Sequence, residues 1–99
     1  MTSRELTLNV NGADIQLDYF VQGFIDHVVS GMLAALENTS QINNLELAIN
    51  GEKVSVNQNG EDVPLNFFVN KVIRNTIIGI VTSLKGIDRV DELALHIAK

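Results

Sequence analysis

Cysteine and tryptophan are absent from this chain of 99 residues, and proline occurs once, at Pro64. Without cysteine there can be no disulfide, no thiolate nucleophile and no cysteine-ligated zinc. The most apolar stretch, residues 67–84, is interrupted by lysine, arginine and two asparagines. A membrane-spanning helix needs about 20 predominantly apolar residues, and the first residues lack the pattern of a secretory signal. We therefore expect a cytoplasmic protein that has no membrane partner.

Basic residues are also scarce. The chain has 7 lysines and arginines against 12 aspartates and glutamates, which gives a net charge of −5. Binding to a phosphate backbone depends on clustered basic side chains. We therefore expect no nucleic-acid partner.

The residue types that carry catalysis or hold metals are few and poorly spaced. His27 follows Asp26, but adjacent residues of a helix do not face each other. His96 has its nearest acids, Asp91 and Glu92, in the segment that precedes it. The chain has no pair of histidines at metal-binding spacing, no glycine-rich phosphate loop and no nucleophile elbow. The sequence therefore predicts no catalytic residue, no metal site and no cofactor, and we expect the protein not to be an enzyme.

What the chain does contain is an internal repeat. Residues 6–49 align with residues 54–97 at an offset of 48, without a gap. Most of the identical positions are apolar or turn residues, among them Phe20/Phe68, Ile25/Ile73 and Gly31/Gly79. The repeat therefore indicates a duplicated fold and points to no particular site.

Asn-Gly occurs three times, at residues 11–12, 50–51 and 59–60. Both residues tolerate the positive φ of a two-residue type I′ turn, so each pair predicts a hairpin. Pairing outward from the turns matches apolar residues with apolar residues: Leu8 with Ile15, Leu47 with Val54, and Val56 with Val63. The predicted strands are 5–10, 13–17, 45–49, 53–58, 61–65 and 93–97.

Two segments between these strands have apolar residues at helical spacing, from Phe20 to Leu36 and from Phe68 to Leu84. Asp18 and Asn66 stand at equivalent N-cap positions. Asn38 and Gly86 stand at equivalent positions just past the expected helix ends, where a left-handed residue is common.

Each copy is therefore expected to run strand, strand, helix, strand. The sequence predicts one α+β domain over residues 1–99, made of two copies at about 5–49 and 53–97. It forms a two-layer sandwich with a mostly antiparallel sheet and both helices on one face. Pro64 cannot donate a backbone hydrogen bond, so strand 61–65 is expected at an edge of the sheet. The repeat suggests that the last strand lies beside the first.

The helices suggest an association surface. Asp26 of the first copy is matched by Arg74 of the second, and the apolar stripes, which include the adjacent Ile77 and Ile78, are wider than one sheet requires. The candidate interface residues are Asp26, Met32, Arg74, Ile77 and Ile78. Complementary helices would pair within one chain or in a symmetric dimer. The alternatives are solvated charges that contribute little and apolar residues that belong to the core.

The opposite face of the sheet is expected to be polar, with Asn9, Asp14, Asn57, Asp62 and His96 as candidate site residues. Small polar side chains on a rigid sheet could bind a polar ligand or a peptide. Alternatively, they keep a solvent-facing surface soluble, and Asx side chains support the nearby turns.

Part of the second copy resembles a known sequence module. Residues 59–69, Asn-Gly-Glu-Asp-Val-Pro-Leu-Asn-Phe-Phe-Val, are followed by Asn-Thr-Ile-Ile-Gly at 75–79 and Ser-Leu-Lys-Gly at 83–86. This pattern is similar to a short module of uncharacterised bacterial proteins, and to segments attached to some proteins of molybdopterin-guanine dinucleotide biosynthesis. The first copy departs from it, with Gln16 in place of Pro64. The resemblance implies an accessory domain that pairs with a copy of itself, and it assigns no catalytic residue.

The sequence thus favours a small protein-interaction or oligomerisation module whose partner is itself, as a homodimer, or another protein. An accessory factor in molybdenum-cofactor metabolism and a small-ligand-binding protein are the alternatives.

The Asn-Gly turns give a direct test. Gly12→Val or Gly60→Val should lower the free energy of unfolding by more than ~1 kcal/mol, because a β-branched residue resists positive φ. Urea denaturation measures this loss. If neither variant differs from the parent protein within error, the hairpins are wrong.

Overall fold

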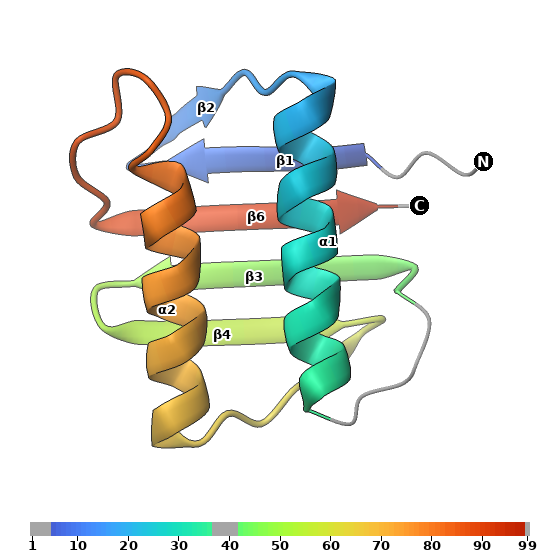
Figure 1. Cartoon of the computed structure of the whole chain (residues 1–99). Helices are drawn as coiled ribbons and strands as arrows, with labels where there is room; N and C mark the ends of the chain where they lie inside the picture. The colour runs from blue at the N-terminus through green and yellow to red at the C-terminus, as the bar shows by residue number, and fades with distance from the viewer. Residues whose placement is uncertain (1–4, 37–41, 99) are drawn as a thin grey trace.

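The computed structural model describes residues 5–36 and 42–98, and within these ranges the chain forms a two-layer α+β structure (Figure 1). The elements are β1 (Glu5–Val10), β2 (Ala13–Ile15), α1 (Tyr19–Ala35), β3 (Asn44–Asn50), β4 (Lys53–Gln58), β5 (Glu61–Asp62), α2 (Phe67–Val81) and β6 (Glu92–Ala98). Both helices lie on one face of the sheet, run across the strands and are antiparallel to each other. The predicted fold class is confirmed. The molecule is a slab of 35 × 35 × 19 Å.

The strands lie in the order β2-β1-β6-β3-β4-β5, and every neighbouring pair is antiparallel. β6 lies beside β1, as predicted, and its other neighbour is β3. The offset of 48 residues relates β1 to β4, β2 to β5 and β3 to β6. Exchanging each strand with its counterpart gives the same strand order, read from the opposite edge of the sheet. The two halves meet at the β3–β6 pair in the middle of the sheet, where Leu47 faces its own counterpart, Leu95. The two halves of the chain therefore share one sheet.

Two asparagines in the hairpin turns fasten each half to the other. The Asn11 side chain accepts hydrogen bonds from the backbone N–H groups of Asp91 (2.8 Å) and Glu92 (2.9 Å), at the start of β6. Its amide also donates to the carbonyl oxygen of Arg89 (2.9 Å). At the matching position, Asn59 accepts from the N–H groups of Asn43 (2.9 Å), which precedes β3, and Asn44 (3.0 Å), which begins it.

Two of the three hairpins have the predicted register. Leu8 faces Ile15 across the first turn. At the third turn Asn57 faces Asp62, which is the register in which Val56 is opposite Val63 as predicted. Asn11 and Asn59 have the positive φ values, 52° and 54°, that a type I′ turn requires.

The register of the middle hairpin was predicted wrongly. Leu47 faces Val56, where Val54 was expected, because Asn50 pairs with Lys53 and the loop is Gly51–Glu52. Gly51 alone has positive φ here, 61°, as in a turn of type II′. The shift moves the pairing by two residues and so keeps every side chain on its predicted face.

The edge strands are shorter than predicted, because β2 ends at Ile15 and β5 ends at Asp62. β5 is an edge strand, as Pro64 indicated. Short edge strands offer little unpaired backbone to another chain.

The helices begin where they were predicted to begin. Asp18 and Asn66 are the N-caps, and each accepts a hydrogen bond of 2.8 Å from the N–H three residues later. α2 ends at Val81, earlier than expected, and two further turns of chain follow it. Gly86 does have a positive φ of 89°, but it ends this extension and not the helix. Asn38 lies outside the described residues.

The core lies between the two layers. Each helix buries three residues at intervals of four, and these residues match at the offset of 48: Ile25, Val29 and Leu33 in α1, with Ile73, Ile77 and Val81 in α2. They pack on the inward-facing residues of β1, β3, β4 and β6. Ile77 is 1% exposed, so its assignment to a surface interface is wrong.

The opposite charges of Asp26 and Arg74 do not reflect a pair between the helices. Arg74 Nε donates to the carbonyl oxygen of Gly51 (2.7 Å), and its guanidinium lies 3.6 Å from the carboxylate of Glu52. Asn70 of α2 also donates to the Glu52 carbonyl oxygen (2.9 Å) and accepts from the Val54 N–H (2.8 Å). α2 therefore uses its polar residues to hold the β3–β4 turn.

The asparagine fastening predicts a measurable loss of stability. Asn11→Gly keeps the positive φ accessible but removes three side-chain hydrogen bonds, so the free energy of unfolding should fall by about 2 kcal/mol. Chemical denaturation measures the change. A loss below ~0.5 kcal/mol would show that these bonds do not hold β6 in place.

Candidate functional site

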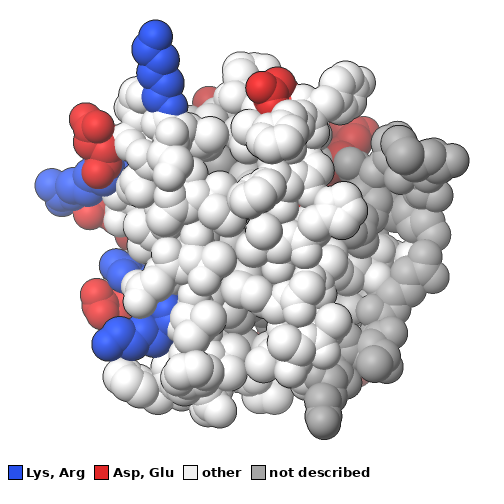
Figure 2. Space-filling model, viewed as in Figure 1, with Lys and Arg blue, Asp and Glu red and all other residues white. Residues whose placement is uncertain are grey.

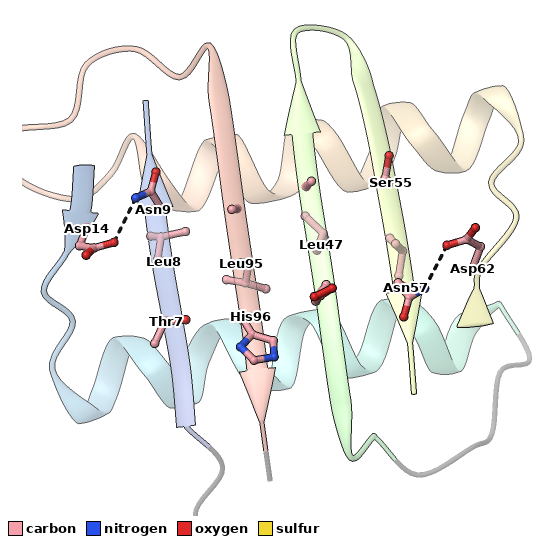
Figure 3. A pocket seen from close by; sticks show the side chains of 14 residues that line it. Thr7, Leu8, Asn9, Asp14, Leu47, Ser55, Asn57, Asp62, Leu95 and His96 are labelled. Atoms are coloured by element: carbon pink, nitrogen blue, oxygen red, sulfur yellow. Dashed lines mark hydrogen bonds between the residues drawn. The ribbon is translucent and has the colours of Figure 1, made fainter. Parts of the chain in front are cut away.

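The first candidate site is a hollow of about 440 Å³ on the sheet face that the helices leave open (Figure 3). All five polar residues predicted for this face line it: Asn9, Asp14, Asn57, Asp62 and His96. The strands that carry them come from both halves of the chain.

The strand register arranges the face in two rows. Thr7, His96, Glu46, Asn57 and Asp62 face one another in sequence across five strands, and so do Asp14, Asn9, Ala94, Ala48 and Ser55. Residues 48 apart occupy matching places in the two rows. Glu46 and His96 are matched by the small Ala94 and Ala48, so the two rows differ most at their centre.

The asparagine–aspartate pairs at the two ends of the face are already occupied by hydrogen bonds. The Asn9 amide donates to Asp14 (3.0 Å) and its oxygen accepts from the Gly12 N–H (3.1 Å). Asn57 makes the same two bonds, to Asp62 and from Gly60, both at 3.1 Å. These residues support the adjacent turns, which is the structural alternative considered for them.

His96 has neighbours that the sequence did not reveal. Glu46 faces it across the β3–β6 pair, and His96 Nε2 lies 3.0 Å from Asn44 Oδ1. The sequence placed its nearest acids at Asp91 and Glu92, because the partner strand of β6 is set by non-local pairing. This register places a carboxylate and an imidazole at neighbouring positions on the open face. Among the described residues, however, no group of three or more His, Cys, Asp or Glu is placed to hold a metal ion.

The second candidate site is the outer surface of the helix layer, which exposes large apolar side chains. Phe20 is 77% exposed and Phe24 49% in α1, while Phe68 is 71% exposed and Val72 39% in α2. The rings of Phe20 and Phe24 stack with their centroids 6.1 Å apart. Tyr19 and Phe67, at the first positions of the helices, are also exposed. These rings extend the apolar stripe that the sequence indicated.

A hollow of about 530 Å³ lies between the helices on this outer surface. Phe20 and Phe24 of α1 line it together with Gly79 and Ser83 near the end of α2. Because the helices are antiparallel, the aromatic start of one lies beside the small residues at the end of the other. The offset of 48 puts Phe68, Val72 and Gly31 at matching positions at the other end of the layer.

This surface carries little charge. Figure 2 shows that the lysine, arginine, aspartate and glutamate side chains gather at the rim, mainly along the α2 side, and leave the middle over the helices uncharged. Asp26, Lys71 and Arg74 are the only such residues in the two helices. Arg74 turns away to the β3–β4 turn.

The remaining predicted interface residues lie at the sides of the helices. Asp26 accepts a hydrogen bond from the hydroxyl of Ser30 (3.1 Å). Met32 and Ile78 are half-buried and pack against the core. The structure therefore does not gather the five candidates into one surface, and the exposed phenylalanines were not among them.

The rest of the described molecule gives no additional candidate site, either among its buried polar atoms or as a membrane-spanning helix. No buried side-chain nitrogen or oxygen of the described residues lacks a hydrogen-bond partner. No helix within the described ranges is long and apolar enough to cross a membrane. No protein-family model, curated protein or solved structure matches the chain.

The turn-supporting role of the asparagines can be measured. Asn57→Ala should lower the free energy of unfolding by about 1 kcal/mol, because it removes two hydrogen bonds at the third turn. Ser55→Ala, on the same face, is the control and should change it by less than about 0.5 kcal/mol. Equal stability of both variants and the parent would leave Asn57 without a structural role.

Proposed function

We propose that this protein is a cytoplasmic protein-interaction module that binds its partner through the outer surface of the helix layer. The observation that carries the proposal is the set of exposed phenylalanines, Phe20, Phe24 and Phe68, around an uncharged surface. Phe20 and Phe24 stack on each other, and Phe68 lies at the other end of the same layer. Soluble domains rarely leave large contiguous apolar patches in water unless these contact another molecule.

The area involved supports the proposal. At these exposures the three rings present on the order of 400 Å², which is half of the ~800 Å² that each partner contributes to a standard interface. Phenylalanine is also among the residues enriched at interfaces, where charged residues are depleted from the centre. The broad faces of the slab, 35 × 35 Å, provide ample surface for the remainder.

A small polar ligand in the sheet-face hollow is the second candidate, and the volume of that hollow favours it. Its support is weaker, because Asn9 and Asn57 are already bonded to the turns. The polar groups at the turns are thus partly used within the chain, which leaves mainly Glu46, His96 and the hydroxyls of Thr7 and Ser55 to contact a ligand.

Site-specific photocrosslinking tests the proposal. A photoreactive phenylalanine analogue replaces Phe68, and the control carries it at Ser55, an exposed position on the sheet face. In the cells that make the protein, we expect a defined crosslinked protein from position 68 and none from position 55. Its mass identifies the partner, as a second copy or a different protein. The absence of any crosslink from position 68, or the same product from both positions, would refute the helix-layer interface.

A further inference from the structure

We infer that the partner of the helix layer is a second copy of this chain, and that the phenylalanine ridge of each copy lies in the hollow between the helices of the other. The ridge is the stacked pair Phe20 and Phe24, and the hollow is the one lined by Gly79 and Ser83. This inference rests on the proposed function, because it names the occupant of the same surface.

The first argument is shape. The stacked rings of Phe20 and Phe24 lie beside a recess on one surface. At the other end of the layer the sequence repeats one ring, Phe68, and one glycine, Gly31. A two-fold axis brings the same patch of each copy together, so a surface that carries both a projection and a recess can satisfy both contacts at once. A partner of different structure would need a projection and a recess of its own at the matching spacing.

The second argument is charge. The chain has a net charge of −5, so two copies repel each other over most of their surfaces. Among the described residues, none in the middle of the helix layer has an acidic or basic side chain that would meet its own copy. The sheet face is different, because Asp14, Glu46 and Asp62 all lie on it.

The third argument is the absence of a steric reason for Gly79 within one chain. A Cβ added at Gly79 meets nothing within 4 Å, and its φ is not one of those that favour glycine. Glycine inside a helix lowers its stability relative to other residues. Gly23 and Gly31 of α1 share this property, but Gly79 is the one of these three glycines that lines the hollow, where the lack of a side chain lets another molecule approach the backbone closely.

Gly79→Leu therefore separates docking from folding. An added Cβ meets nothing within 4 Å and leucine favours the helix over glycine, so the denaturation midpoint should stay equal or rise. The same side chain fills the hollow and should weaken dimerisation at least tenfold, as measured by sedimentation velocity over a micromolar concentration series. Gly23→Leu is the matched control: it makes the same change in α1, also with nothing within 4 Å of the added Cβ, outside the hollow, and should leave dimerisation unchanged.

Phe20→Gln tests the other half of the proposed contact, the phenylalanine ridge that enters the hollow of the second copy. Its ring is 77% exposed, so the fold should persist, while dimerisation should again weaken at least tenfold. A parent protein that stays monomeric throughout the series would overturn the inference, as would a Gly79→Leu protein that dimerises as tightly as the parent. If the parent is monomeric and position 68 crosslinks a different protein, the interaction module stands and self-docking fails. If no crosslink forms either, both fail.

Discussion

The pairing of β3 with β6 is the constraint on which the rest of the structure depends. These are the last strands of the two halves of the chain, and they lie together at the centre of the sheet, with Leu47 facing Leu95. β1 therefore receives its inner neighbour from the second half, and β4 receives its inner neighbour from the first. Neither half can complete its own sheet, and the turn asparagines fasten each half to the strand donated by the other. The apolar core is made of residues from both halves.

The same two-fold arrangement shapes the outside of the molecule. It makes the helices antiparallel (Figure 1), so that the aromatic start of α1 lies beside Gly79 and Ser83 near the end of α2. The three inward-facing apolar residues of each helix are buried in the core. The outer rings have no such role within one chain, and this is the physical basis for assigning them to a partner.

Much of this fold could be predicted from the sequence, because its main signals are local. Asn-Gly turns, alternating strands and the Asp18 and Asn66 caps depend on residues a few positions apart. The middle hairpin was missed because two registers, two residues apart, both match apolar with apolar residues, and Gly51–Glu52 makes a turn as readily as Asn50–Gly51 does. The polar sheet face was predicted for the same local reason, since strand alternation alone assigns its residues.

Features that depend on distant parts of the chain were not accessible in this way. The position of Glu46 beside His96 follows from the neighbour of β6, which no local pattern specifies. The buried position of Ile77 could not be distinguished from the half-buried position of Ile78 until the helix was oriented on the sheet. The opposite charges of Asp26 and Arg74 suggested a helix pair, but Arg74 holds a turn that exists at only one of two equivalent places.

The β3–β4 turn is present in one half of the sheet, and its counterpart between β6 and β1 is absent because the described chain begins and ends there. Asn50 and Lys53 are paired neighbours joined by a two-residue loop, and the residues 48 positions away from them, Ala98 and Glu5, are paired neighbours too. The described ends of the chain therefore meet as an open hairpin. A short linker between Ala98 and Glu5, with a new break at the Gly51–Glu52 loop, would give a circular permutant with the same sheet order. In this architecture, where the polypeptide begins and ends is a matter of connection only, because every pairing in the sheet is independent of it.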